Sequence, residues 1–304
     1  MAFPRPPMRF LSTAATLWLL AWPAAAASPP AEEPSVDLIK RPGHANFETA
    51  DTGVSVTYQV HFGGFRLASA SFRATLQDGE YEAESRAKTA GLLTLFTNSD
   101  VHVGSRGLVP VAQTRPQPQR YTADLVDRKK RQFVELIYGE TGPEKILSKP
   151  QYNYKKRNVP DAQKKRTIDP ASAILAMSLT DADTSANPCG EPIQIYDGRR
   201  RFDVAFKFVD VETISVGRQG VYRGPATRCI IYHTEIAGFK KKDRDIAEWP
   251  PWHVWFGAIE GTPFRVPVRL EARTPYGVGV AAIASIDKKR AAEYAAPPLD
   301  GASR

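Results

Sequence analysis

Short runs of alternating apolar and polar residues dominate this chain from Val54 to about residue 287. Examples are "VSVTYQVHF", "FRLASASFRATL", "RRFDVAFKFVDVETI" and "CIIYHTEI", and turn signals such as Gly63-Gly64 and Asp78-Gly79 separate such runs. A period of two places successive side chains on opposite faces of a β-strand. The pattern therefore predicts an all-β dominated fold of roughly eleven to thirteen antiparallel strands. Their length and single apolar face predict one large curved sheet or a barrel-like wrap.

One segment, "DPASAILAMSLTDA", breaks the alternation. Asp169 is a good N-cap and Pro170 a good first helical residue. Apolar residues then recur at helical spacing, at Ala171, Ile174, Leu175 and Leu179. We expect one prominent helix over about 170–180, which plugs or covers the sheet.

The N-terminus has the features of a secretory signal peptide. Arg5 and Arg9 precede the uncharged run "FLSTAATLWLLAW", and the small residues "PAAAAS" follow it. The run is shorter than the about 20 residues that span a bilayer. We expect export to the periplasm with cleavage near Ala27; the alternative is an N-terminal anchor that is never cut. The expected organisation is a signal peptide (1–27), a flexible leader (28–50), a single β-rich domain (51–288) and a loose tail (289–304).

The charge is moderately basic and unevenly distributed. The full chain carries a formal charge of +8, and loss of the signal peptide removes two arginines and no acid. Basic clusters occur in "DRKKRQF", "YKKRNVPDAQKKR", "GRRRF" and "KKKDRD". They are either solvated turns and strand ends or contacts for anionic lipid or acidic glycans. In an exported protein we expect no nucleic-acid partner.

The chain has two cysteines, Cys189 and Cys229. An exported protein with an even cysteine count usually pairs them, so we expect one disulfide between these two. The chain-entropy estimate of its contribution is roughly 4 kcal/mol. A metal site is not expected, because it would need more ligands than two cysteines and the five histidines show no tight ligand spacing. No cofactor is expected either.

The stretch "YDGRRRFDV" predicts a hairpin that turns at Asp197-Gly198. Along its second strand, Phe202 and Val204 share one face, whereas Arg199 and Arg201 share the other. Arg199 and Arg201 are candidate binding residues. They either form a solvated face that guards an edge or bind an anion, because guanidinium groups suit carboxylate and phosphate.

The stretch "EWPPWHVWFG" predicts an aromatic loop over residues 249–257. Its candidate binding residues are Trp249, Trp252, His253 and Trp255. Such a loop can be a sugar platform, a membrane-dipping tip or a protein-binding hot spot. It can equally fold back and cover the mouth of a barrel.

The order of these features resembles a bacterial envelope family, domain of unknown function 3108. The resemblance rests on "TYQVHFGGFRLASA", on the Asp-Pro helix start "DPASAILA", and on "CGEPIQIYDGRRRFDV" with a later cysteine. It implies a periplasmic β-rich protein with no recognised catalytic residues. The sequence itself contains no G-x-S-x-G, H-E-x-x-H or P-loop motif.

Together these features favour a non-enzymatic protein of the cell envelope. It would bind a lipid, an acyl-bearing molecule or an envelope protein, and it would contact an anionic membrane surface peripherally. The alternative is a glycan-acting enzyme or sugar-binding protein that uses the 249–257 loop. A hydrolase of that kind would need two carboxylates across one cleft.

The pairing of Cys189 with Cys229 makes a chemical prediction. A thiol titration of the denatured, unreduced protein should find no free thiol, and the same titration after reduction should find both cysteines. Equal titres before and after reduction would show that the two cysteines are not bridged.

Overall fold

The computed structural model describes residues 51–95, 97–110, 115–128, 130–152, 158–179, 187–215, 221–239 and 250–294. Within these residues there are thirteen strands. The first seven are β1 (Asp51–Phe62), β2 (Phe65–Gln77), β3 (Glu80–Thr89), β4 (Ser99–Leu108), β5 (Gln117–Asp127), β6 (Lys130–Gly139) and β7 (Gly142–Lys149). The others are β8 (Ile193–Tyr196), β9 (Arg201–Ile214), β10 (Gly224–Ala237), β11 (Trp252–Ala258), β12 (Arg265–Thr274) and β13 (Gly277–Lys289).

The helices of the described residues are few and short. They are α1 (Asp161–Lys164), α2 (Pro170–Leu179) and the 3₁₀ helices η1 (Gly91–Leu95) and η4 (Ala291–Glu293). None of them is both long and apolar enough to cross a membrane. The helix predicted over about 170–180 is confirmed as α2.

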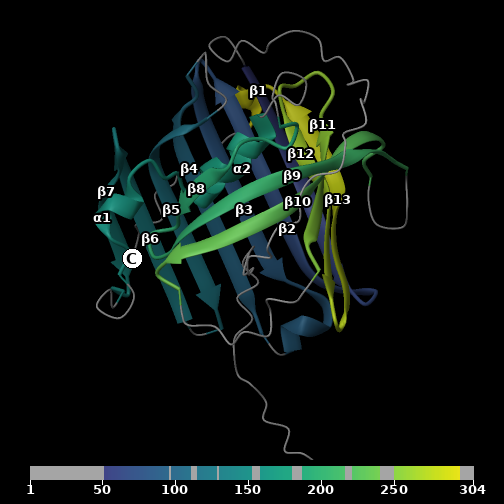
Figure 1. The fold of residues 1–304 in the computed structure, drawn as a ribbon, viewed down its shortest axis with the longest axis horizontal. Coiled ribbons are helices and arrows are strands. Elements are labelled where there is room, and N and C mark those ends of the chain that lie inside the picture. Colours follow the sequence, from purple (N-terminus) through teal and green to yellow (C-terminus); the bar gives the residue numbers. More distant parts are fainter. Residues whose placement is uncertain are drawn as a thin grey trace, which may run out of the picture.

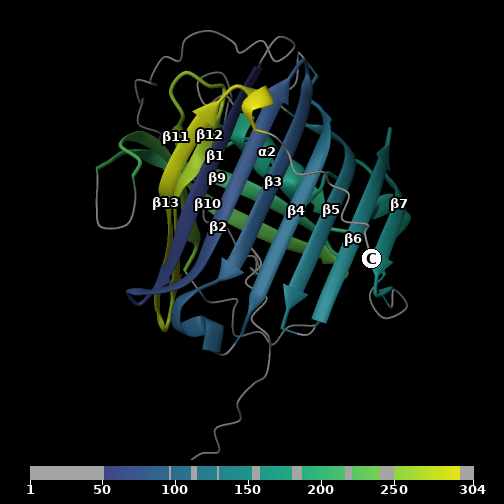
Figure 2. The same cartoon turned by 180° about the vertical axis from the view of Figure 1, so that it is seen from behind.

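All thirteen strands belong to one antiparallel sheet, in the order β7-β6-β5-β4-β3-β2-β1-β13-β12-β11-β10-β9-β8. Neighbours in the sheet are neighbours in the chain, except that β1 pairs with β13. The two ends of the domain therefore meet in the middle of the sheet. β1 to β6 run side by side in Figure 2, and in Figure 1 β9 and β10 cross in front of them. The predicted curved antiparallel sheet is confirmed.

The segment before α2 brings the two edge strands together. The Arg166 backbone N–H donates to Thr141 O, just before β7, at 2.7 Å. Two residues later, Ile168 donates to Gln194 O and accepts from the Tyr196 N–H of β8, both at 3.0 Å. These bonds close the wrap through an intervening segment, since β7 and β8 are the two ends of the sheet order in the described residues.

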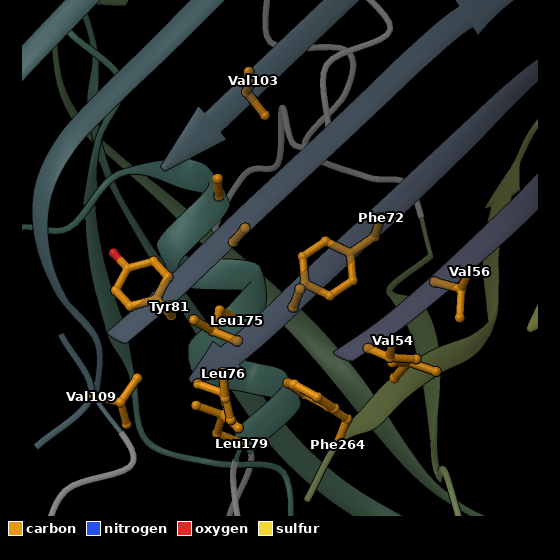
Figure 3. Close-up of a cluster of buried hydrophobic side chains, with 14 of the residues drawn as sticks. Val54, Val56, Phe72, Leu76, Tyr81, Val103, Val109, Leu175, Leu179 and Phe264 are labelled. Atoms are coloured by element: carbon orange, nitrogen blue, oxygen red, sulfur yellow. The ribbon is translucent and has the colours of Figure 1, made fainter. Parts of the chain in front are cut away.

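α2 lies inside the wrap. It contacts β3, β4 and β5 on one side and β8 and β12 on the other. Most of its residues are buried, namely Ala171, Ser172, Ala173, Leu175, Ala176, Ser178 and Leu179. A helix that is apolar all round is stable only when it is enclosed. Figure 3 shows Leu175 and Leu179 grouped with Leu76 of β2 and with Phe264, so side chains fill the interior around α2.

Both ends of α2 have charged partners that are almost completely buried. Asp169 is the N-cap, because the Ser172 N–H donates to its Oδ1 at 2.9 Å. Near the C-terminus, Arg265 Nε donates to the Met177 carbonyl at 3.2 Å. Both side chains are at most 1% exposed. Acid at the start of a helix and base at its end complement the unpaired N–H and C=O groups and the helix dipole.

A loose tail is predicted from residue 289, and this predicted start is too early. β13 continues to Lys289, and the Ala291 N–H donates to Asp51 Oδ1 at 2.8 Å. The Tyr294 hydroxyl donates to Asp287 O at 2.9 Å, so the chain packs on β1 and β13 through residue 294. Residues 1–50 and 295–304, where the signal peptide, the leader and the rest of the tail are predicted, lie outside the described residues.

The β8–β9 turn gives a stability prediction. Gly198 has a φ of +88°, and a Cβ at this position would lie 2.4 Å from Val134 Cγ1 on β6. Gly198→Ala should therefore combine backbone strain of about 1–3 kcal/mol with overpacking of about 1–3 kcal/mol. The measurement is the free energy of unfolding from denaturant titration.

Gly64 supplies a matched control, because it has the same φ of +88° and nothing within 4 Å of its Cβ position. Gly64→Ala should show the strain without the overpacking. Equal losses of stability in the two variants would contradict the close contact between the β8–β9 turn and β6.

Candidate functional site

The arginines after the Asp197-Gly198 turn are used mainly inside the fold. Asp197 Oδ1 accepts the backbone N–H groups of Arg199 and Arg200 at 2.9 and 2.6 Å, and Asp197 Oδ2 pairs with the Arg200 guanidinium at 2.8 Å. Arg201 is buried and donates to the Gln163 carbonyl at 3.0 Å. The predicted solvated face or anion site is therefore wrong for Arg201. Its side chain instead connects β9 to α1, in the segment that precedes α2.

Arg199 is the one predicted arginine that keeps a half-exposed side chain. Its guanidinium lies 5.1 Å from the centroid of the Tyr152 ring. This contact resembles a cation–π pair at a partly exposed position. The structure thus separates Arg199 from Arg201 and gives them different environments.

The aromatic stretch is a strand from Trp252 onward, so the predicted loop is wrong for residues 252–257. Trp255 is 5% exposed, and its indole N–H donates to Glu212 Oε2 at 2.9 Å. The Arg269 guanidinium covers its ring at 5.4 Å from the centroid. A covered indole cannot act as a sugar platform. Trp249 lies outside the described residues.

Trp252 and His253 at the start of β11 are partly exposed. Burial and the nearby Arg228 guanidinium lower the pKa of the His253 imidazole below its ordinary value. The His253 ring lies 6.0 Å from Trp255. The structure brings His253 and Trp255 together and places both on β11, which is eight positions along the strand order from β6, the strand that contacts the β8–β9 turn.

The charges around Trp255 neutralise one another. The register aligns Asp210, Arg228, Trp255 and Arg269 across β9 to β12. Arg228 pairs with Asp210 at 2.5 Å and with Glu212 at 2.8 Å. Acidic groups held in this way balance the arginines, so the cluster fits a stabilising role better than acid–base chemistry.

The cysteines are joined in the structure. The Cys189 and Cys229 Sγ atoms are 2.01 Å apart, and both residues are fully buried. The bridge ties the segment after α2 to β10. Among the described residues, no three His, Cys, Asp or Glu side chains are arranged to hold a metal ion.

A buried polar network surrounds Asp169. Its Oδ2 accepts from Ser172 Oγ at 2.5 Å and from Ser105 Oγ at 2.8 Å. Tyr81 Oη lies 2.7 Å from Ser172 Oγ. Burial raises the pKa of the Asp169 carboxyl to about 6, against hydrogen bonds that lower it. All four side chains are at most 2% exposed, so the network has no surface for a substrate and links α2 to β3 and β4.

Among the described residues, the aromatic side chains with the largest exposed fractions are at two neighbouring hairpin tips. Phe65 follows the β1–β2 turn and is 62% exposed, and Tyr276 in the β12–β13 turn is 83% exposed. The tips are adjacent because Phe62 at the end of β1 pairs with Gly279 at the start of β13. Both turns lie at the lower edge of the molecule in Figures 1 and 2.

We call this surface the tip patch. Its members are Phe62, Phe65, Arg66, Arg273, Tyr276 and Val278. Sequence reasoning identified the Gly63-Gly64 turn but not the patch. The sequence does show an aromatic residue beside each of the two turns. It does not show that the turns are adjacent, because this depends on the pairing of β1 with β13.

The fold defines an antiparallel β-wrap with an internal helix, and comparisons with other proteins add a family. A β-barrel-like protein of a domain of unknown function, DUF1849, from Brucella abortus has a TM-score of 0.46 and 8% identity, over 80% of this chain and 99% of that chain. A protein from Parabacteroides distasonis, provisionally described as a lipoprotein, has a TM-score of 0.30 and 8% identity, over 81% and 100%. No curated protein matches. The family described as "Protein of unknown function (DUF3108)" matches residues 57–283, and the chain belongs to this family.

The Asp169 network predicts a specific pH dependence. In the folded protein the pKa of the Asp169 carboxyl is about 6, whereas its ordinary pKa is 3.8. Because the folded state binds this proton more tightly than the unfolded state, protonation of Asp169 stabilises the fold. This contribution is complete below the unfolded pKa and is lost as the pH rises through the folded pKa. The free energy of unfolding of the wild type should therefore fall between about pH 4 and 6, relative to that of Asp169→Asn.

Asparagine keeps a good N-cap, so the comparison isolates the ionisation. Asp78→Asn, in the exposed β2–β3 turn, is the control and should follow the wild type. A constant difference between wild type and Asp169→Asn across this interval would rule out the raised pKa.

Proposed function

We propose that this protein is a non-catalytic component of the cell envelope that attaches peripherally to a membrane through the tip patch. The observation that carries the proposal is the exposure of Phe65 and Tyr276 on adjacent hairpins. Clustered exposed apolar side chains mark interaction surfaces on soluble domains. Aromatic side chains with a polar atom, such as Tyr276, favour the headgroup region of a bilayer.

The position of the patch suits a flat partner. It lies at the ends of β1, β2, β12 and β13, which are consecutive strands of one sheet. The Phe62 ring lies 3.3 Å from the position that a Cβ on Gly277 would occupy, so the two hairpins are in close contact at their tips. Two supported hairpins can present their aromatic side chains to a bilayer together, with little cost in ordering.

The interior favours surface contact over lipid carriage. Leu76, Leu175, Leu179 and Phe264 occupy the space around α2 (Figure 3), and each is at most 2% exposed. An acyl chain in this region would have to displace the helix. The surface is therefore the better place for a lipid contact.

The compartment is also part of the proposal. The buried Cys189–Cys229 bridge is typical of an oxidising environment, and the N-terminal sequence has signal-peptide features. We place the protein in the periplasm. The burial of Trp255 under Arg269 weighs against the sugar-binding alternative.

The test is flotation of the exported, detergent-free protein with vesicles of phosphatidylethanolamine and phosphatidylglycerol. The wild type should float with the vesicles. Phe65→Ser with Tyr276→Ser should lower the partition coefficient at least about tenfold, because two apolar contacts are lost. Thermal unfolding should be unchanged, since both side chains are exposed.

The control pair is Leu108→Ser with Leu147→Ser. These residues are also exposed, at 39% and 43%, and they lie on β4 and β7, away from the patch. The control should bind like the wild type. Absence of wild-type flotation, or equal loss in both double variants, would reject the proposal.

A further inference from the structure

We infer that the tip patch selects anionic phospholipid through Arg66 and Arg273; this inference rests on the proposed membrane attachment. Both side chains are exposed. Arg66 directly follows Phe65, and Arg273 lies three residues before Tyr276. Each exposed aromatic residue therefore has an arginine within three residues of it in the same hairpin.

These two arginines differ from several arginines of the outer strands. Arg73, Arg86, Arg120 and Arg131 pair with acids on the neighbouring strand, as in Arg73–Glu84, Arg86–Asp100, Arg120–Glu135 and Arg131–Asp124. Within the described residues, neither Arg66 nor Arg273 has an ion-pair partner within 4.0 Å. Their charge is available to a partner.

The two hairpin tips themselves contain no acidic residue. The tips "HFGGFRL" (61–67) and "ARTPYGVGV" (272–280) contain no Asp or Glu. The preceding residue, Glu271, is 13% exposed at its side chain and pairs with Arg269. The patch therefore presents apolar surface and positive charge together, which complements the negative headgroups of a bilayer.

The spacing of the arginines fits separate headgroups. Arg66 is on β2 and Arg273 on β12, with β1 and β13 between them. Three strand spacings amount to about 15 Å, which is more than one phosphate can bridge. Guanidinium groups suit phosphate oxygens because they offer paired N–H donors. Insertion of Phe65 and Tyr276 would bring both groups to headgroup depth.

The experiment compares flotation with phosphatidylcholine vesicles and with vesicles that also contain phosphatidylglycerol. Each charge near an anionic surface contributes enough that Arg66→Gln with Arg273→Gln should lower the partition onto the anionic vesicles about 30-fold. About 0.5 M NaCl should have a similar effect on the wild type. Binding to phosphatidylcholine alone should change little in the variant.

Two control variants separate the site from general charge. Arg106→Gln with Lys145→Gln removes the same net charge from exposed positions on β4 and β7 and should bind like the wild type. Arg66→Lys with Arg273→Lys keeps the charge and should retain most of the binding. Thermal unfolding of each variant confirms that it is folded.

The outcomes distinguish the two proposals. Equal wild-type binding to both kinds of vesicle overturns the inference and leaves the membrane attachment standing. Equal loss in both glutamine variants also overturns it, because net charge would then explain the selectivity. Absence of binding to either vesicle overturns both proposals.

Discussion

The enclosure of α2 is the constraint on which the rest of the structure depends. A helix inside a sheet cannot leave its terminal N–H and C=O groups to water, so protein groups must satisfy them. Asp169 does this at one end and Arg265 at the other. Both are costly to bury, and each is stabilised by the end of the helix whose partial charge is opposite to its own. The same contacts fix the helix between β3, β4 and β5 on one side and β12 on the other.

The closing of the wrap follows from the same region. Ile168 and Asp169 are neighbours, so the residue that pairs with β8 directly precedes the residue that caps α2. Arg201 joins this junction through the Gln163 carbonyl, and Gly198 lets the β8–β9 turn approach β6. The arginines after the Asp197-Gly198 turn therefore mainly help to hold the two edges of the sheet together. Their guanidinium groups are thus largely occupied and offer little to an anionic ligand.

The sequence predicted what local patterns control. Alternation gave the strands, Asp169-Pro170 gave the start of α2, and Asp78-Gly79 gave a turn with positive φ at both residues. Trp255 was misjudged because both faces of β11 are covered: Val254 and Phe256 pack in one cluster, and Trp255 packs in the other. A strand covered on both faces shows no useful alternation.

Arg201 and the tip patch were missed for a different reason, since each depends on contacts between distant parts of the chain. Besides the nearby Asp203, Arg201 bonds to a backbone carbonyl in α1, which no charge pattern reveals. Phe65 and Tyr276 become neighbours only because β1 pairs with β13. Local periodicity is informative about the faces of one strand, and it carries no information on which strands adjoin.

The arrangement assigns different roles to the interior and the rim. The polar groups of the interior, such as Asp169 and Ser172, are enclosed and bonded to one another, so they can hold the fold but cannot meet a ligand. Several charges of the outer strands are paired across neighbouring strands, as in Arg73–Glu84 and Arg120–Glu135. The tip patch combines exposed aromatic rings with arginines that have no ion-pair partner among the described residues. Exposure of aromatic surface to water is unfavourable. Binding of a partner that covers this surface is therefore favoured by the hydrophobic effect. Both hairpins flank the β1–β13 pairing in the middle of the sheet, so the sheet itself holds the tip patch in place.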